Sequence, residues 1–261
     1  MTIRFLDSLP LSDRGLHYGD GLFETMCVSA GAVRLLEFHL ERLALGAERL
    51  GLVLPDSAEL YRAFEEAAAE LGEGVLKLIV TRGSGGRGYL PPEIVSPSLI
   101  LLRYPPMGVT ADEVAARLCD LRLARQPRLA GIKHLNRLEY VLARAEWSDP
   151  AIGEGLLLDT EGFLVEGVVS NLFLVRGGRL LTPSLDHCGV DGVMRRHVMA
   201  RAGTLGVPVE VKALGMEDLL GADEVFLTNS LSGIRAVTHL LDHRTWEAGP
   251  LTRQLRKGLW R

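Results

Sequence analysis

The sequence predicts an α+β protein with two domains. A chain of 261 residues with 47% apolar residues can bury one large core or two of ordinary size. Helix-like and strand-like segments are mixed without the regular alternation that builds a doubly wound parallel sheet. The run Pro105-Pro106-Met107-Gly108 then interrupts the pattern. We therefore predict an N-terminal domain over residues 1–105, a linker over 106–112 and a C-terminal domain over 113–261.

The first half opens with a turn-rich segment, Ser12–Met26, whose three glycines and two aspartates around aromatic residues are typical of a specific tight loop. After it, apolar alternation predicts strands and longer apolar periods predict helices. Strands are expected at Thr25–Val28, Val33–Leu36, Val75–Thr81 and Leu99–Tyr104, and helices at Glu37–Leu50 and Pro55–Leu71. A glycine loop with two arginines, Arg82–Tyr89, joins the last two strands.

The sequence of the second half predicts a domain rich in strands, with three helices. Strands are expected at Ala116–Leu123, Gly155–Asp159, Val168–Val175, Arg179–Thr182, Val209–Lys212, Glu224–Thr228 and Ala236–Leu240. Helices are expected at Leu135–Trp147, after Cys188–Arg195 as far as Leu205, and at Leu251–Trp260.

The stretch Gly131–Tyr140 is the first candidate for a catalytic segment. It joins the turn-forming loop Arg125–Gly131 to an amphipathic run in which Leu135, Leu138 and Val141 share a helical face. Lys133 is therefore expected at the start of a helix, where unpaired N–H groups and the positive end of the dipole disfavour the ammonium and lower a lysine pKa. A neutral lysine can form a Schiff base with a carbonyl group. The alternative is an ordinary hydrated cation.

Lysine is rare in this chain, which has only four: Lys77, Lys133, Lys212 and Lys257. Lys77 interrupts an apolar strand, Lys212 follows a strand, and Lys257 lies beside arginines in the last predicted helix. We expect these three to be hydrated surface charges.

Two loops and one arginine have the composition of an anion site. Gly189–Met194 precedes a helix, so the N–H groups of Gly192, Val193 and Met194 could face a phosphate. Thr228-Asn229-Ser230 follows a buried strand and offers hydroxyl and amide groups. Arg42 lies among leucines at helical spacing and could bind a phosphate. The alternatives are a glycine turn, a capping turn and an arginine that extends to the surface.

Glu166 lies before a predicted strand and near Asn171, in an apolar context. A buried carboxylate needs a partner, and one suitable partner is the protonated ring nitrogen of a pyridine cofactor. The alternative is a Glu exposed in a turn, like Glu161.

Composition and motifs exclude several other classes. The formal net charge of −4 gives no basic surface for nucleic acid. No apolar run approaches the roughly 20 residues of a membrane helix, and the N-terminus lacks a signal-peptide layout. The three cysteines, Cys27, Cys119 and Cys188, form no metal or disulfide pattern, and the histidines show no ligand spacing, so we expect no metal and a cytoplasmic location.

Taken together, these segments resemble the fold-type IV pyridoxal-phosphate enzymes, a group that holds branched-chain and D-amino-acid aminotransferases and aminodeoxychorismate lyase. The segments that carry the resemblance keep the family order along the chain. They are Asp13-Arg14-Gly15, Tyr18-Gly19-Asp20-Gly21, Phe23-Glu24-Thr25, His39–Leu43, the lysine loop, Glu166 with Asn171-Leu172-Phe173, Gly192–Arg195 and Thr228-Asn229-Ser230. The resemblance implies a small N-terminal α/β sandwich, a larger barrel-like C-terminal domain, pyridoxal 5'-phosphate as cofactor and a homodimer.

The resemblance also implies a role for each candidate residue. Lys133 would carry the cofactor and move protons, helped by Thr25, and Glu166 would pair with the pyridine nitrogen. The remaining cofactor-binding residues would be Arg42, Asn171, Gly192, Val193, Met194, Thr228, Asn229 and Ser230. The substrate-binding residues would be Arg87, Tyr18 and Phe23.

Within the group, Ala130–Glu139 and Arg82–Tyr89 are most similar to aminodeoxychorismate lyases. Aminotransferases of the group typically place Asn-Tyr after the lysine, where this chain has Asn136-Arg137, and Arg87-Gly88-Tyr89 is not the Arg-x-His carboxylate trap of D-amino-acid types. The resemblance thus implies a lyase that converts 4-amino-4-deoxychorismate, a small molecule, to 4-aminobenzoate and pyruvate. A branched-chain or D-amino-acid aminotransferase, a non-catalytic cofactor-binding protein and an α+β protein without cofactor are the alternatives.

Overall fold

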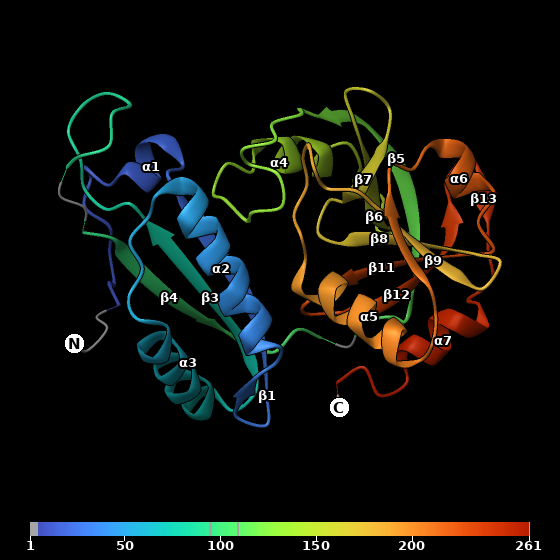
Figure 1. Cartoon of the computed structure of the whole chain (residues 1–261), viewed down its shortest axis with the longest axis horizontal. Coiled ribbons are helices and arrows are strands. Elements are labelled where there is room, and N and C mark those ends of the chain that lie inside the picture. Colours follow the sequence, from blue (N-terminus) through green and yellow to red (C-terminus); the bar gives the residue numbers. More distant parts are fainter. Residues whose placement is uncertain (1–4, 94–95, 109, 261) are drawn as a thin grey trace. The chain divides into compact units, whose positions relative to one another are not determined.

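The computed structural model describes residues 5–93, 96–108 and 110–260 (Figure 1). The chain forms two compact units. The first comprises Met1–Gly108 with Ile132–Asn136, and the second Val109–Gly131 with Arg137–Arg261. The predicted α+β class is confirmed. The sequence did not predict that the lysine segment packs with the first unit. Residues 1–4 and 109, which belong to the predicted first domain and linker, lie outside the described residues.

The first unit contains one antiparallel sheet of four strands in the order β2-β1-β3-β4. Its strands are β1 (Gly21–Ser29), β2 (Ala32–Val33), β3 (Gly74–Thr81) and β4 (Ser98–Tyr104), and its helices are α1 (Arg14–Tyr18), α2 (Leu36–Leu50) and α3 (Ser57–Leu71). The short helix α1 was predicted as loop. Asp13 caps it by accepting a hydrogen bond from Gly15 N at 2.8 Å.

Helices α2 and α3 pack against the face of β1 that carries Leu22, Met26 and Val28, which are all buried. The approach of α2 is close: a Cβ atom on Gly46 would lie 2.9 Å from a methyl group of Leu22. The other face of β1, with Phe23 and Thr25, is only half-buried. The period of two along a strand therefore gives β1 a helix-covered face and a face that remains accessible within its unit.

The second unit is built on a nine-stranded sheet with the order β10-β9-β8-β11-β12-β5-β6-β7, with β13 beside β12. Its strands are β5 (Glu113–Leu123), β6 (Ile152–Asp159), β7 (Leu164–Gly167), β8 (Asn171–Arg176), β9 (Arg179–Pro183), β10 (Val209–Lys212), β11 (Glu224–Asn229), β12 (Gly233–Leu240) and β13 (Arg244–Thr245). Its helices are α4 (Leu138–Arg144), α5 (Val193–Thr204), α6 (Met216–Leu220) and α7 (Pro250–Arg256).

This sheet is curled (Figure 1). Strand β7, at one end of the strand order, contacts β8 and β9, which lie near the other end. Both faces are buried at β6: Leu156 and Leu158 join one hydrophobic cluster, and Leu157 joins another. The predicted barrel-like architecture is confirmed.

Two local predictions are wrong. The strand predicted at Val168–Val175 starts too early, because β8 begins at Asn171. The separate strand β7, which ends at Gly167 and contains Glu166, was not predicted. Helix α4 begins at Leu138, five residues after Lys133. The predicted apolar face of α4 is exposed, with Leu138 at 76% and Val141 at 60%, whereas Tyr140, Ala143 and Trp147 pack into the core.

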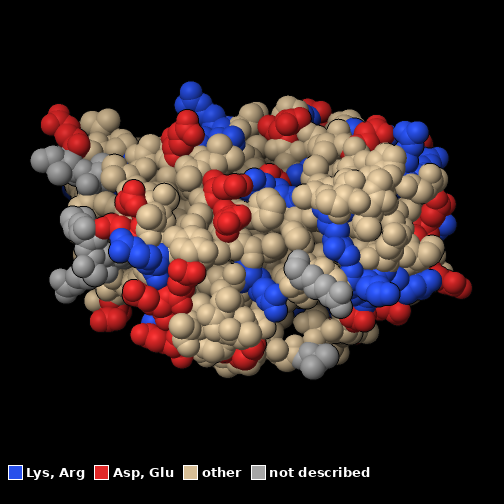
Figure 2. Space-filling view, turned by 60° about the horizontal axis from the view of Figure 1, so that its bottom comes forward, with Lys and Arg blue, Asp and Glu red and all other residues tan. Residues whose placement is uncertain are grey.

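Acidic and basic side chains are mixed over the face shown in Figure 2, in keeping with the small net charge. None of the described helices has the length and apolarity that a membrane crossing requires.

Candidate active site

The lysine segment extends the sheet of the first unit at the edge of β1. Leu22 and His134 form an antiparallel bridge, Phe23 N donates to the carbonyl of Lys133 at 3.0 Å, and Leu135 N donates to the carbonyl of Gly21 at 3.0 Å. Since paired residues share a face and neighbours alternate, Lys133 projects on the face of Phe23. Its Nζ lies 4.5 Å from the centre of the Phe23 ring.

Position in the sheet, and not a helix terminus, therefore fixes Lys133. The expected helix-dipole contribution to its chemistry is wrong, since the first turn of α4 starts too late in the chain. Asn136 anchors the end of the segment, donating from Nδ2 to the carbonyl of Gly19 at 3.1 Å. Gly19 has a φ of 63°, and a Cβ there would lie 2.6 Å from Asn136 Oδ1, so this position requires glycine.

A second lysine lies on the same face. Thr25 is the register partner of Lys77 in β3, so both side chains project with Phe23 and Lys133. Lys77 Nζ lies 5.3 Å from the centre of the Phe23 ring. Lys77 is half-buried within its unit, and no carboxylate among the described residues forms an ion pair with it.

On the helix-covered face of β1, Glu24 binds two residues of α2. His39 Nδ1 lies 2.6 Å from Glu24 Oε2, and Arg42 donates from Nε to Oε1 at 2.8 Å and from Nη2 to Oε2 at 2.5 Å. Burial raises the pKa of Glu24, but the charge of Arg42 and the contacts with His39 outweigh it and lower the pKa from 4.5 to about 2. Arg42, predicted at a phosphate, thus has a buried acidic partner that the sequence analysis missed.

Arg14 holds the loop that carries Arg87. Its guanidinium donates to the carbonyls of Gly88 at 3.0 Å and Tyr89 at 2.9 Å, and its Nε donates to Asp20 at 2.9 Å. Tyr18 accepts a hydrogen bond from Gly88 N at 3.2 Å and meets the Tyr89 ring edge-on. Arg87 itself is exposed. Arg14 therefore fixes the loop backbone and leaves the Arg87 side chain to bind elsewhere.

In the second unit, three donors hold the buried carboxylate of Glu166. Tyr140 donates to Oε1 at 2.5 Å, while Asn171 Nδ2 and Val190 N donate to Oε2 at 3.2 Å and 3.1 Å. Burial and the neighbouring Glu166 raise the pKa of Tyr140 well above its usual value, so its hydroxyl remains a donor. The sequence contained Tyr140 in the lysine stretch but gave no signal for this contact.

The start of α5 lies next to this carboxylate network. Gly192 is the N-cap residue of α5, and as a glycine it offers no side chain to cap the first N–H groups of the helix. A Cβ on Gly192 would lie 1.9 Å from Asn171 Oδ1, so only glycine fits. Val193 and Met194 follow as the first buried residues of the helix. Backbone N–H groups and the positive end of the dipole therefore meet at this point, an arrangement that suits an anion.

At the end of β11, Thr228 is 1% exposed and its Oγ1 has no hydrogen-bond partner among the described residues. Asn229 Oδ1 accepts hydrogen bonds from Leu231 N at 3.0 Å and Ser232 N at 2.7 Å, so its side chain closes the turn. Ser230 is half-buried in this turn. A buried hydroxyl without a partner is unfavourable unless a ligand or water meets it.

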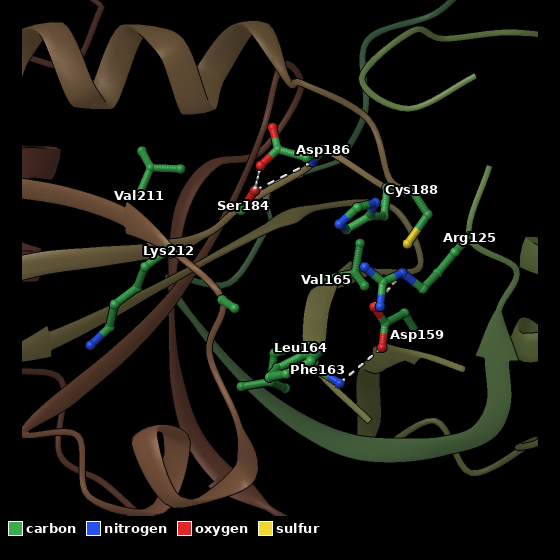
Figure 3. Close-up of a pocket in the computed structure, with 12 residues that line it drawn as sticks. Arg125, Asp159, Phe163, Leu164, Val165, Ser184, Asp186, Cys188, Val211 and Lys212 are labelled. Atoms are coloured by element: carbon green, nitrogen blue, oxygen red, sulfur yellow. Dashed lines mark hydrogen bonds and ion pairs between the residues drawn. The ribbon is translucent and has the colours of Figure 1, made fainter. Parts of the chain in front are cut away.

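The second unit also contains a cavity of about 460 Å³. Figure 3 shows Arg125 beside Asp159 on one wall, with Nε 3.7 Å from Oδ2. Val165 lines the cavity, and its neighbour Glu166 projects from the other face of β7. None of the predicted site residues lines this cavity, and we do not assign the reaction to it. Among the described residues, this cavity included, no group of three or more His, Cys, Asp or Glu could hold a metal ion.

Comparison with known proteins defines the class. Residues 21–240 match the family model of amino-transferase class IV. A solved structure of 4-amino-4-deoxychorismate lyase from Pseudomonas aeruginosa is 51% identical, with a TM-score of 0.94 over 98% of this chain and 96% of that chain. The aminodeoxychorismate lyase of Vibrio harveyi is 34% identical over 96% of this chain and 95% of its own length. A branched-chain aminotransferase structure from Thermoproteus uzoniensis is 27% identical, with a TM-score of 0.86 over 97% of this chain and 88% of that chain.

The chain belongs to the class IV aminotransferase family, and the predicted resemblance to fold-type IV pyridoxal-phosphate enzymes is confirmed.

Proposed function

We propose that this protein is a pyridoxal-phosphate-dependent lyase that converts 4-amino-4-deoxychorismate to 4-aminobenzoate and pyruvate. The observation that carries the proposal is the pairing of the lysine segment with β1, which fixes Lys133 on the face of Phe23 and Thr25. The likeness to lyases from Pseudomonas and Vibrio over nearly the whole chain supports this choice of reaction.

The residues of the second unit fit the cofactor. The carboxylate of Glu166, oriented by three donors, suits a protonated pyridine nitrogen. The glycine start of α5 and the unpartnered hydroxyl of Thr228 suit phosphate oxygens. We assign Val193, Met194, Asn229 and Ser230 to the same phosphate group, with Arg42 as its arginine. Asn171 contributes by positioning both Glu166 and the loop at Val190.

When bound, pyridoxal phosphate accepts the electron pair left at the carbon that bears the substrate amine. Lys133 is the group that removes the proton from that carbon. The ether bond to the enolpyruvyl group on the neighbouring carbon breaks, and Lys133 or Thr25 returns a proton to its methylene carbon, which gives pyruvate. The six-membered ring of the substrate becomes aromatic, and the free energy of this aromatisation favours the reaction.

The substrate carries two carboxylates, and the first unit offers two cations for them. Arg87 is exposed on the loop held by Arg14, and Lys77 lies on the face of Lys133 without an acidic partner among the described residues. We assign Arg87 and Lys77 to the carboxylates, and Tyr18 and Phe23 to the walls around the ring. From the sequence, Lys77 was expected to be a hydrated surface charge, and it was not among the predicted substrate-binding residues.

We also propose that the protein is a cytoplasmic homodimer. The support is the family membership and, for the location, three cysteines that all remain free thiols.

The test supplies 4-amino-4-deoxychorismate to the protein loaded with pyridoxal phosphate and measures both products. We expect equal amounts of 4-aminobenzoate and pyruvate, no turnover with Lys133→Ala, and normal turnover with the control Lys212→Ala. Faster transfer of an amino group from D- or branched-chain amino acids to 2-oxoglutarate would instead establish the aminotransferase alternative. That alternative has relatives on its side, such as the D-alanine aminotransferase of Bacillus licheniformis, which is 27% identical over 97% of this chain and 90% of its own length.

A further inference from the structure

Glu24, His39 and Arg42 form a buried polar cluster in the first unit, which we call the Glu24 cluster. The three residues are 2%, 1% and 6% exposed. His39 and Arg42 are three residues apart on α2, so both reach the same carboxylate on β1. Of these three residues only Arg42 belongs to the proposed cofactor site, so Glu24 and His39 have no role in it.

The contacts fix the direction of the arginine. Glu24 takes Nε and Nη2, the two donors along one edge of the guanidinium. Because a guanidinium is planar and rigid, holding that edge also sets the direction of Nη1. Any anion that Arg42 binds must therefore meet a guanidinium whose orientation Glu24 has set.

His39 in turn holds Glu24. A carboxylate whose pKa is about 2 is ionised and only accepts hydrogen bonds, so Nδ1 of His39 must donate to Oε2. Nε2 of the same ring is buried and has no hydrogen-bond partner among the described residues. A buried nitrogen in this condition needs a water or a ligand group nearby. The cluster therefore carries one polar atom that the described chain does not satisfy.

Stability alone is a weak reason for such a cluster. Desolvation of buried ion pairs offsets much of their attraction, and apolar residues of similar volume often serve a core as well. A charged arginine held in a fixed orientation is of use where it meets an anion.

We propose that Glu24 is a positioning residue which, held by His39, aims the guanidinium of Arg42 at the phosphate of the cofactor. This inference rests on the proposed function, in which Arg42 binds that phosphate. Glu24 then acts on the phosphate through Arg42 without touching it.

The experiment compares two ligands that differ only in the phosphate. Apoprotein is titrated with pyridoxal 5'-phosphate and with pyridoxal, and absorbance gives a dissociation constant for each. The ratio of the two constants is the phosphate preference. It is measured for wild type, Glu24→Gln, His39→Ala, Arg42→Lys and the double variant Glu24→Gln/Arg42→Lys. Glu65→Gln, an exposed carboxylate on α3, is the charge-matched control.

We expect Glu24→Gln to lose about 10- to 100-fold of the phosphate preference, the range for a hydrogen bond to a charged group. Pyridoxal affinity should remain within about twofold, since the ring contacts do not involve the cluster. His39→Ala should shift the preference in the same direction, and the double variant should be no worse than Arg42→Lys, because the two residues act as one unit.

Equal loss for both ligands in Glu24→Gln, or no loss for either, would overturn the inference while leaving the proposed function intact. A full phosphate preference in Arg42→Lys would also overturn it. If wild type binds neither ligand, the proposed function itself fails, and the inference fails with it.

Discussion

Lowering the pH should destabilise the first unit through Glu24. Its pKa is about 2 in the folded protein against an ordinary 4.5. A depressed pKa contributes stability that is fully present above 4.5 and is lost as the pH falls from 4.5 toward 2. The shift corresponds to about 3 kcal/mol of unfolding free energy at neutral pH. The Glu24→Gln variant cannot ionise, so it should be less stable than wild type at neutral pH and should lack this pH dependence.

The assay must report on the first unit. All three tryptophans, Trp147, Trp246 and Trp260, lie in the second unit, so their fluorescence follows the wrong part of the chain. Hydrogen exchange of the β1 and α2 amides in a urea series, corrected for the intrinsic exchange rate at each pH, measures the unfolding free energy where Glu24 acts.

We expect the difference between wild type and Glu24→Gln to narrow by about 1.4 kcal/mol per pH unit below about pH 4.5. The Glu65→Gln control should follow wild type throughout. A difference that stays constant between neutral pH and about pH 3.5 would refute the assignment of Glu24 as the buried, charge-stabilised acid.

Three further substitutions test other parts of the account. Gly192→Ala places a Cβ against Asn171 Oδ1, so it should weaken pyridoxal-phosphate binding at least tenfold by absorbance titration. The matched control on the same helix, Gly203→Ala, meets nothing within 4 Å and should bind normally. Lys77→Met should raise KM for the dicarboxylate substrate in steady-state kinetics and leave the cofactor dissociation constant unchanged; an unchanged KM would remove Lys77 from the substrate site. The comparison variant is Lys257→Met. Tyr140→Phe removes a donor to Glu166 and should cost about 1.5–3 kcal/mol in cofactor affinity or stability. Tyr61→Phe, at an exposed position, should change neither measurement.

Much of the fold could be predicted because strands and helices follow local patterns. Alternation along Val75–Thr81 and Leu99–Tyr104 matches β3 and β4 closely. Helix α4 shows where local pattern fails. Its leucines and valine suggested one face, but the second unit buries the stripe at Tyr140, Ala143 and Trp147. Which side of an amphipathic segment is covered depends on tertiary neighbours, and periodicity does not contain them.

Residues of the candidate site could be predicted where a single residue type carries the chemistry. Contacts between segments that are distant in the sequence could not be predicted. The rarity of lysine and the local motif singled out Lys133, but its support comes from pairing with β1, far away in the sequence. Lys77 was not predicted as a site residue, because a single charged residue in an apolar strand is usually exposed to solvent. The partner of Arg42 was missed for a similar reason. Glu24 lies 18 residues before Arg42, on a strand and not on the same helix, so no local pattern connects the two. Such contacts require the folded sheet and its register.

The most direct test of the central claim is to map where the cofactor attaches. The protein loaded with pyridoxal phosphate is treated with borohydride, which makes the bond to a lysine permanent, and the peptides are then examined by mass spectrometry. The chain offers four lysines as possible sites. We predict the pyridoxyl mass on Lys133 alone, in a one-to-one ratio with the chain. A label on Lys77, Lys212 or Lys257 with Lys133 unmodified, or no label at all, would contradict the account.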